Sequence, residues 1–403
     1  MNTAADTSTL KNWDRARLGD HTLKIGSGVT PRGGEAAYLK SGIPLIRSQN
    51  VHMNRFELEG LVRISQEQDS EMADTRVCPG DVLLNITGAS IGRVCLAPSQ
   101  LCPANVNQHV CIIRTDPTID PAFLSYFLAS PEFQRFIVNT EAGATRQALT
   151  KGQIEDFQVP RPPLPEQRRI AGQLEQADRL RRTRRYALEL TDTFLPAAFL
   201  ELFGSPREAF KRWRVVRLAD CCQRITDGTH LTPEFLHEGV PFIFVKNIEN
   251  ARIDFKTDKF ISDEVHGKLY ARCPVEEDDI LYTIVGATYG QAAPVGAFTK
   301  FAFQRHIAHL RPNPTQVIPK FLVTMMQLPI VKTQADRWAR GAAQPTINLK
   351  ELKEFLIPVP PLSLQKKFAA LVERVERLRA VQREALRQAE HFFASLLHRA
   401  FSG

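Results

Sequence analysis

Polar side chains that can pair with nucleic-acid bases occur at matching points of two similar stretches of this chain. Arg, Lys, Gln and Asn carry donors and acceptors that suit base edges and phosphate oxygens, and hydroxyl groups lie beside them. In the first stretch the candidates are Arg47, Gln49, Asn50, Ser90, Arg93, Asn107, Gln108, Arg146 and Gln147. In the second they are Lys246, Asn247, Thr288, Tyr289, Gln291, Gln304, Arg305 and Gln344. Ordinary surface loops have the same composition, so residue types alone leave DNA contact and simple solvation both open.

The chain contains no motif of an enzyme that would act on such a ligand. It has no Gly-x-x-x-x-Gly-Lys-Ser/Thr phosphate loop, so we expect no ATP hydrolysis. Amino-methylating enzymes share an Asn/Asp-Pro-Pro-aromatic loop, which Asn313-Pro314-Thr315 fails at two positions. His306 and His309 lie on a predicted strand, where they would point to opposite faces, and they have no obvious third partner for a metal. We therefore predict no catalytic or metal site.

The segment PPLPEQRRI at residues 162–170 returns as PPLSLQKKF at 360–368, an offset of 198. The same offset joins Asp81 with Asp279, Gly88 with Gly286, Gly92 with Gly290, Pro121 with Pro319, Gly143 with Gly341 and Phe157 with Phe355. Near the start of each copy the offset drifts to 200 and then 197, as small loop insertions would cause. A sustained internal repeat predicts two copies of one module. Equivalent loops differ in sequence while this frame repeats, which favours modules that read two different short sequences.

Each module should be a mixed α/β domain. Residues 43–51 and 240–248 alternate as strands that enter polar loops, and GDVLLNITGASIG (80–92) and DDILYTIVGATYG (278–290) indicate an apolar strand followed by a sharp glycine loop. We expect a further strand to carry Asn107 to His109 and, in the second module, Gln304 to His306. Helices should follow at 121–139 and 319–340.

A long helix is predicted after each module, at residues 166–204 and 363–403, where glycine and proline are nearly absent. The expected apolar stripe on the second helix is Phe368, Leu371, Val375, Leu378, Ala385, Ala389, Phe392 and Leu396, which is a coiled-coil seam of about four heptads. On the first helix it is Ile170, Leu174, Ala177, Leu180, Leu188, Phe194 and Ala198. The two helices should pack antiparallel against each other, and Pro196 should kink the first near Leu195.

Composition is that of a globular protein of 403 residues, long enough for two domains. The net charge of +8 suggests a polyanionic partner, but residues 1–165 contain 16 Lys and Arg against 17 Asp and Glu, so charge supports DNA binding only weakly. The seven cysteines form no Cys-x-x-Cys pair and are expected to be reduced. There is no apolar run of membrane-spanning length and no signal peptide pattern, so a cytoplasmic location without membrane contact is expected.

The whole pattern resembles the DNA-specificity subunits of type I restriction-modification systems. Members of that family consist of a target-recognition domain, a helix, a second target-recognition domain and a second helix, and they have Pro-Pro-Leu-x-x-Gln followed by a basic pair at the start of each helix. Both copies are present here, with Gln167 and Gln365 in register. The sequence departs from its own repeat at Leu364, where the first copy has Glu166, at Val285, where it has Thr87, and at Pro196.

The resemblance implies an α+β fold with domains at 1–165 and 205–362, helical spacers at 166–204 and 363–403 that pair as an antiparallel coiled coil, and an internal pseudo-two-fold repeat. It implies a subunit without activity of its own that binds double-stranded DNA at a bipartite, asymmetric site. Two copies of a methyltransferase subunit would bring S-adenosylmethionine, and a restriction subunit would bring ATP and Mg²⁺; this chain would hold no cofactor. The methyltransferase contacts implied by the repeated motif are Gln167, Arg168, Arg169, Gln365, Lys366 and Lys367.

Three alternatives remain open at this point. The chain could serve a methylation-only or other defence system that lacks a restriction subunit. It could be a coiled-coil adaptor whose modules bind proteins, or an enzyme that methylates or cuts DNA alone, which the missing motifs disfavour.

Overall fold

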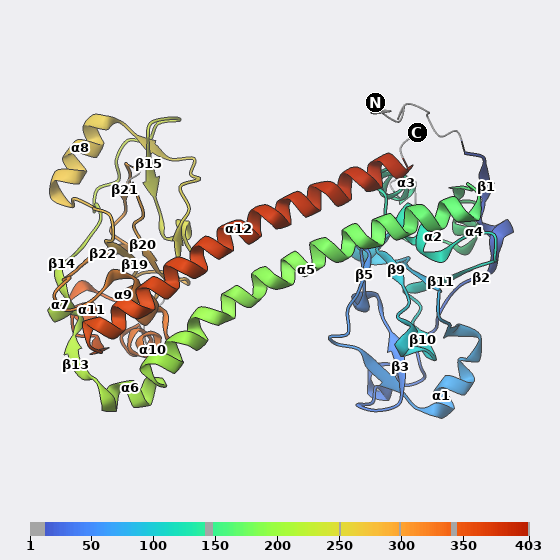
Figure 1. Cartoon of the computed structure of the whole chain (residues 1–403), viewed down its shortest axis with the longest axis horizontal. Coiled ribbons are helices and arrows are strands. Elements are labelled where there is room, and N and C mark those ends of the chain that lie inside the picture. The colour runs from blue at the N-terminus through green and yellow to red at the C-terminus, as the bar shows by residue number, and fades with distance from the viewer. Residues whose placement is uncertain (1–12, 142–147, 250, 298–299, 340–344, 402–403) are drawn as a thin grey trace, which may run out of the picture. The chain divides into compact units, whose positions relative to one another are not determined.

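The computed structural model describes residues 13–141, 148–249, 251–297, 300–339 and 345–401 (Figure 1). Its contacts divide the chain into two compact units, residues 1–185 with 384–403, and residues 186–383. Each unit contains one globular module and parts of both long helices, α5 (Leu164–Phe203) and α12 (Leu362–Phe401). The α+β class is confirmed. The expected division into two domains and two separate helical spacers remains a prediction.

The first unit is built on two four-stranded sheets. An antiparallel sheet has the order β2-β11-β8-β9, formed by Thr22–Ser27, Val110–Thr115, Val82–Asn85 and Val94–Leu96. A mixed sheet has the order β6-β3-β10-β7, formed by Val62–Ile64, Ile43–Ile46, Ala104–Val106 and Arg76–Val77. Two short antiparallel pairs join β1 (Arg15–Arg17) to β12 (Gln158–Pro160) and β4 (Val51–His52) to β5 (Arg55–Phe56). The helices of the module are α1 (Gln66–Glu71), α2 (Pro121–Leu128), α3 (Pro131–Glu141) and α4 (Lys151–Glu155).

The second unit has the same sheet order in its antiparallel sheet, β14-β22-β19-β20, formed by Cys222–Asp227, Ile307–Pro312, Ile280–Thr283 and Ala292–Pro294. A three-stranded sheet follows the order β18-β15-β21, from Phe260–Ile261, Val240–Ile243 and Ala302–Phe303. The short pairs are β13 (Arg214–Arg217) with β23 (Leu356–Val359) and β16 (Ile248–Glu249) with β17 (Arg252–Ile253). The helices are α6 (Pro206–Arg212), α7 (Leu218–Cys221), α8 (Asp263–Arg272), α9 (Pro319–Gln327), α10 (Pro329–Trp338) and α11 (Leu349–Lys353).

The predicted apolar strands of the two modules are confirmed as β8 and β19, and all four residues of each are buried. Two other local predictions were wrong. Each helix expected after the sheets is two helices, because Pro131 and Pro329 stand at the first positions of α3 and α10 and cannot continue the helix before them. Asn107 to His109 form a turn between β10 and β11 rather than a strand, and Gln304 to His306 lie at the corresponding turn before β22.

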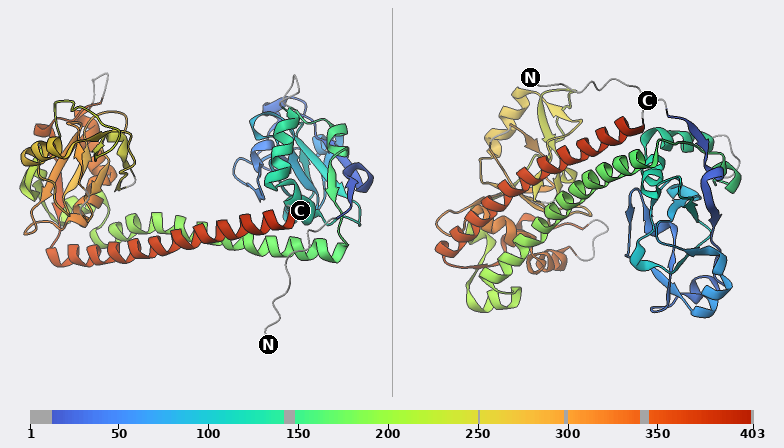
Figure 2. Two further views of the ribbon diagram at one scale, coloured as in Figure 1. Left: turned by 90° about the horizontal axis from the view of Figure 1, so that it is seen from above. Right: turned by 45° about the vertical axis from the view of Figure 1, so that its right-hand side comes forward.

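The last turns of α12 complete the core of the first unit. Phe393, Leu397 and Phe401 are buried in one cluster with Phe123 and Phe127 of α2. The ring of Phe401 lies 5.3 Å from that of Phe123 and 5.5 Å from that of Phe127, between centroids. Both views of Figure 2 show the C-terminal end against the teal helices of this unit. A module that begins near residue 13 is therefore closed by residues near 400.

The second unit is closed in the same manner by the end of α5. Phe199 and Phe203 are buried with Phe321 of α9 and Phe368 of α12. The Phe199 and Phe321 rings stack at 5.6 Å, and Phe368 meets Phe199 edge-on at 5.2 Å. In Figure 1 the helices α9, α10 and α11 gather at the first turns of α12.

Within each unit the two long helices touch in antiparallel directions. In the first, the Arg185 guanidinium lies 2.8 Å from the Glu390 carboxylate, and Arg181 lies 4.0 Å above the Phe393 ring. In the second, Arg379 donates to the hydroxyl and carbonyl oxygens of Thr191 at 3.0 and 2.6 Å. Pro196 does not interrupt α5, which ends at Phe203; the next residue, Gly204, lies in the left-handed region with φ of 87°.

The predicted apolar stripe is wrong at four positions. Leu180, Phe194, Leu378 and Phe392 are 43, 47, 48 and 51% exposed. Inward positions are taken by the next residue in each case, namely the stems of Arg181 and Arg379, Leu195 and Phe393. A strict seven-residue repeat requires 3.5 residues per turn, whereas an α-helix has 3.6, so the buried face drifts around the helix. Packing against the modules, rather than a single seam, decides which face is covered.

Candidate nucleic-acid interface

Four segments of the first module meet at one end of its sheets. The turn after β10 is tied to the end of β3 because Asn107 N–H donates to the Ile46 carbonyl at 3.0 Å. The glycine loop after β8 is tied to the same turn by Ile86 N–H and the His109 carbonyl at 3.0 Å, and by the Thr87 hydroxyl and His109 Nδ1 at 2.5 Å. Gly28 after β2 donates to the Asn107 carbonyl at 3.2 Å. Residues far apart in sequence thus form one continuous surface, made of the loops and turns that follow β2, β3, β8 and β10; we call the exposed residues of these loops the tips.

The second module builds the same set with different side chains. Gln304 N–H donates to the Ile243 carbonyl at 3.3 Å, and Arg305 N–H donates to the Thr229 carbonyl at 2.9 Å. Ile284 N–H donates to the His306 carbonyl at 3.0 Å. By these contacts Gln304 occupies the place of Asn107, and Arg305 that of Gln108. The scaffold repeats while its exposed tips change.

Three of the predicted base-reading residues are used by the fold instead. Asn50 is fully buried; its side-chain oxygen accepts from Arg47 N–H at 3.0 Å, and its amide nitrogen donates to the carbonyls of Glu57 and Glu59. Asn247 makes the equivalent bonds to Phe244, Asp254 and Lys256. Asn107 is buried, and its side-chain oxygen accepts from His109 N–H at 3.1 Å. Because a buried amide that braces a turn is not free to reach a base, we assign these three side chains to the fold rather than to base contact.

Exposed candidates do lie on this surface. They are Gln49 and Gln108 in the first module and Lys246, Thr288 and Arg305 in the second. Ser90, Arg93, Gln291 and Gln304 are half-buried at the edges of the same loops. Arg146, Gln147 and Gln344 lie outside the described residues. The DNA-contact role of all these side chains remains a prediction.

Arg47 and Tyr289 are held by neighbours in fixed orientations. Arg47 donates to the Gly60 carbonyl at 2.8 Å and lies 5.2 Å from the Tyr38 ring centroid. The Tyr289 hydroxyl donates to Asp336 at 2.5 Å, and Lys332 Nζ lies 3.2 Å from the centroid of its ring. These contacts fix the shape of the two loops. A contact of either residue with DNA in this arrangement would have to leave them intact.

The duplicated motif has a structural cause. Gln167 is fully buried; Asp120 N–H donates to its side-chain oxygen at 2.8 Å, and its amide nitrogen donates to the carbonyls of Thr118 and Pro162. Gln365 makes the corresponding bonds to Ile318, Gln316 and Pro360. Each glutamine locks the start of a long helix to the loop before α2 or α9. Because neither side chain reaches the surface, we assign both glutamines to the fold rather than to partner contact.

The basic pairs that follow the glutamines are exposed. Arg169 forms a two-pronged ion pair with Glu166 at 2.7 and 2.8 Å and also donates to Gln173. In the second copy Leu364 replaces Glu166, so Lys367 cannot form the equivalent pair. Arg168, Arg169, Lys366 and Lys367 therefore remain candidates for partner contact, and the two copies differ in local charge.

A buried ion pair joins the two central strands of the antiparallel sheet in each module. Arg114 binds both carboxylate oxygens of the fully buried Asp81 at 2.7 and 2.8 Å. In the second module Arg311 binds Asp279 in the same way, and His309 Nε2 adds a contact at 2.7 Å. His309 is fully buried and also meets the Cys273 sulfur through Nδ1 at 3.4 Å, so its contacts are those of a structural residue.

Acid should destabilise the second module through Asp279. Burial opposes ionisation of this carboxyl, but hydrogen bonds from His309, Arg311 and Glu276 N–H outweigh it and lower the pKa of Asp279. A depressed folded-state pKa stabilises the fold above the ordinary aspartate pKa of about 3.9, and that stabilisation is lost as the pH falls through the folded value. In urea unfolding, the difference in free energy of unfolding between wild type and Asp279→Asn should shrink as the pH is lowered from 5 to 3. A difference that stays constant over this range would contradict the assignment.

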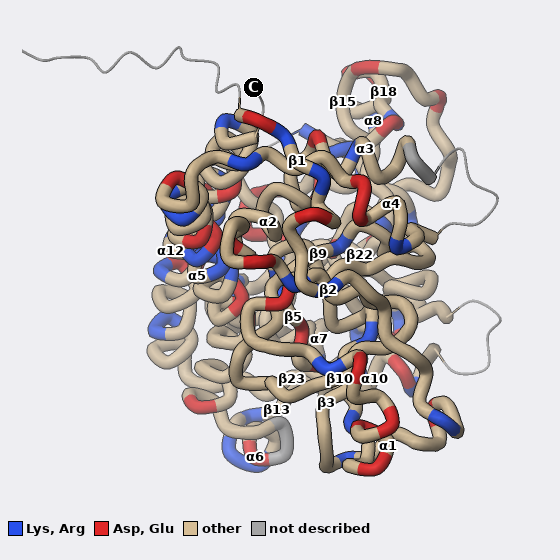
Figure 3. Tube along the Cα trace, turned by 90° about the vertical axis from the view of Figure 1, so that its right-hand side faces the viewer, with Lys and Arg blue, Asp and Glu red and all other residues tan. Residues whose placement is uncertain are grey.

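Charge on the side of the molecule that Figure 3 shows is mixed rather than concentrated. Figure 3 shows Lys and Arg interspersed with Asp and Glu around β2, β5 and β9 of the first module, and along α5 and α12. Contacts to DNA would therefore depend on individual side chains at the tips rather than on a uniformly basic face.

No group of three or more His, Cys, Asp or Glu side chains that could hold a metal ion occurs among the residues described. Within that same part of the chain, every helix is too short or too polar to span a membrane.

One feature of the candidate interface was not predicted from the sequence: the loops that start at Gly28 and Gly228 are part of it. A repeated Thr-Pro pair, at 30–31 and 232–233, was the available signal.

A family model described as "Type I restriction modification DNA specificity domain" matches residues 11–190 and again residues 211–390. The specificity subunit of the Escherichia coli restriction enzyme EcoBI is 25% identical, with 97% of this chain and 86% of that protein covered. The EcoKI specificity subunit of Escherichia coli K12 is 21% identical, with 93 and 86% covered. A crystal structure of the S subunit of a type I restriction-modification system from M. genitalium matches with a TM-score of 0.63 at 16% identity, over 99 and 98% of the two chains. The last comparison shows the shared fold.

Proposed function

Since the chain belongs to the type I restriction-modification DNA specificity family, and this family recognises DNA sequences without catalysing a reaction, we propose that it reads a bipartite, asymmetric site in double-stranded DNA. Each module would read one half-site. The observation that carries this proposal is the pair of equivalent loop sets, tied by equivalent backbone hydrogen bonds but ending in unlike exposed side chains.

The exchanges between the loop sets change hydrogen-bonding chemistry. Gln108, which can both donate and accept, has Arg305 as its counterpart, which only donates. Gln49 likewise corresponds to Lys246. A glutamine pairs well with adenine, whereas arginine pairs well with guanine. Two identical half-sites are therefore not expected.

The long helices would join and space the modules. We propose that they pair as an antiparallel coiled coil related by a pseudo-two-fold axis; the antiparallel contacts of Arg185 with Glu390 and of Arg379 with Thr191 support this. Such a spacer should hold the half-site centres about one DNA turn apart, roughly 10 base pairs. We further propose domains at 1–165 and 205–362, with spacers at 166–204 and 363–403.

Two methyltransferase subunits would dock on the helical segments. The repeated motif gives each copy an equivalent platform, with Arg168 and Arg169 or Lys366 and Lys367 exposed beside a rigid helix start. S-adenosylmethionine would be bound by those subunits, and ATP and Mg²⁺ by a restriction subunit. A solved structure with a similar fold, at 21% identity and a TM-score of 0.56, is described as showing complex assembly in a type I restriction-modification system.

Methylome sequencing tests the proposal as a whole. Cells that carry this chain with a methyltransferase subunit encoded beside it should show adenine methylation at a split motif whose halves differ. Absence of any motif, or methylation by this chain without a partner subunit, would contradict it. A symmetric motif would contradict the assignment of one half-site to each module.

Arg305→Ala should affect one half-site only. Loss of a base-reading arginine typically costs about 1–3 kcal/mol, which corresponds to roughly 5- to 150-fold weaker binding or relaxed choice at one base pair. Methylation mapping should show the change in the half of the motif read by the second module, while Gln108→Ala changes the other half. Equal relaxation of both halves by either variant would contradict the modular assignment.

A further inference from the structure

Leu231 is the most exposed large hydrophobic side chain in the described part of the chain, at 82%. It lies in the loop between β14 and β15, two residues after Thr229. Such exposure gives the fold almost none of the stabilisation that burial of a leucine provides. Single exposed leucines are common on proteins, so exposure alone decides nothing.

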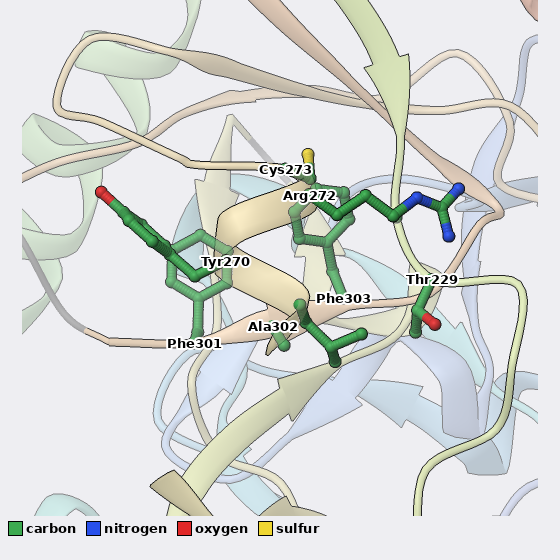
Figure 4. A pocket seen from close by; sticks show the side chains of 9 residues that line it. Thr229, Tyr270, Arg272, Cys273, Phe301, Ala302 and Phe303 are labelled. Carbon is green, nitrogen blue, oxygen red and sulfur yellow. The ribbon is translucent and has the colours of Figure 1, made fainter. Parts of the chain in front are cut away.

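The backbone that carries Leu231 is fixed by hydrogen bonds. Thr229 N–H donates to the Phe303 carbonyl at 3.0 Å, and Leu231 N–H donates to the Thr229 hydroxyl oxygen at 3.2 Å. That hydroxyl donates in turn to the Leu231 carbonyl at 3.0 Å. Figure 4 shows Thr229 and Phe303 at the wall of a hollow about 20 Å³ in volume, which has room for about one water molecule. These hydrogen bonds fix the backbone that carries the exposed Leu231 side chain.

Gly228 sets the position of this loop. A Cβ atom at Gly228 would lie 2.2 Å from the Phe303 carbonyl oxygen, so no other residue fits without a shift of backbone. Gly28 of the first module is pressed against its strand in the same way, 1.7 Å from the Val106 oxygen by the same measure. Both loops start from an equivalent point on the scaffold.

Leu231 stands beside a predicted base-reading residue. The Thr229 carbonyl accepts from Arg305 N–H at 2.9 Å, so the leucine loop and the arginine turn are directly joined. His230, between them in sequence, is turned to Asp227, with 2.8 Å between Nε2 and the carboxylate. This leaves an apolar and a cationic side chain on adjacent tips.

The first module repeats the arrangement with a smaller side chain. Val29 is 49% exposed and precedes Thr30 and Pro31, just as Leu231 precedes Thr232 and Pro233. The Thr30 hydroxyl donates to the Gln108 side-chain oxygen at 2.5 Å, which joins this loop to the counterpart of Arg305. An apolar tip of variable size beside a variable polar tip is therefore a repeated element of the scaffold.

Among groups on the base edges of the major groove, the 5-methyl of thymine is the one that an aliphatic side chain recognises by contact. We propose that Leu231 contacts a thymine methyl group in the half-site read by the second module. This inference rests on the proposed function and adds a residue that selects a base by apolar contact. Arg305 would pair with a neighbouring base or phosphate.

The test uses the complete complex with its methyltransferase subunits and an unmodified duplex that carries the motif identified by methylome sequencing. Each thymine of the second half-site is replaced singly by uracil, which removes only the methyl group, and binding is measured by competition. At one position wild type should bind the uracil duplex roughly four-fold more weakly, as expected for one buried methyl group. Leu231→Ala should bind both duplexes equally, at about the weakened level.

Leu23→Ala is the matched control, because Leu23 is a 70% exposed leucine on β2. It should keep the wild-type ratio between thymine and uracil duplexes. If no uracil weakens wild-type binding, or if Leu231→Ala keeps the wild-type ratio, the inference is overturned. It is also overturned if Leu231→Ala loses binding and a mismatch at one step restores it, since that identifies a wedge between bases. Failure of wild type to prefer the unmodified motif over random duplex would instead refute the proposed function itself.

Discussion

Phe401→Ala should unfold the first module at markedly lower urea concentration, although Phe401 is almost the last residue of the chain. The side chain is buried and its ring packs on Phe123 and Phe127 of α2. Removal of a buried phenylalanine typically costs about 3–5 kcal/mol because it leaves a cavity as well as losing apolar contact. Trp13, whose ring lies 6.4 Å from that of Phe123, reports the loss directly through its fluorescence.

Phe368→Ala is the matched variant for the second module. Phe368 is fully buried against Phe199 and Phe203, so its loss should be of similar size but should move the transition seen by Trp213. Variants that keep a single tryptophan separate the two signals. A Trp13 transition that is unchanged by Phe401→Ala would show that the end of α12 is not part of the first module.

Gln167→Ala should also destabilise the first module strongly. The substitution leaves Asp120 N–H and the carbonyls of Thr118 and Pro162 without the partner that the glutamine supplies. Each buried polar group left unpaired costs roughly 1–3 kcal/mol, so a loss of about 3 kcal/mol or more in the free energy of unfolding is expected. Urea unfolding of the isolated chain measures it.

Gln176 on the same helix is exposed, and Gln176→Ala should change the free energy of unfolding by less than about 0.5 kcal/mol. The competing explanation of the motif is partner contact. Under that explanation Gln167→Ala would leave stability unchanged and weaken only the association with a methyltransferase subunit. This outcome would reverse our assignment of the glutamine to the fold.

Much of the architecture was predictable because it depends on local patterns. The offset of 198 between the proline motifs indicated two modules, and the apolar runs at 82–85 and 280–283 gave the central strands. The ends of the first long helix, α5, followed from Pro165 and Gly204, since such residues start and stop helices through their own backbone preferences. The breaks at Pro131 and Pro329 depend on a local pattern too, because a proline cannot continue the helix before it.

The candidate site was predictable only as a set of loops. Asn50, Asn107 and Asn247 have the residue type that reads bases, yet they are buried and brace turns. Conversely, Leu231 has no donor or acceptor, so a search for polar side chains passes over it. Residue type shows what a side chain can bind, but its neighbours decide whether it is free to bind.

The order of residues alone indicates a duplicated chain with two long helices and two sets of loops that differ in sequence, because repetition and periodicity can be read from that order. The folded structure was needed to show that Gln167 and Gln365 are buried and hydrogen-bonded inside their modules and that Phe401 belongs to a module that begins near residue 13. It also decided which face of each long helix is covered. These features depend on contacts between residues far apart along the chain, and such contacts form only when the packed core brings those residues together.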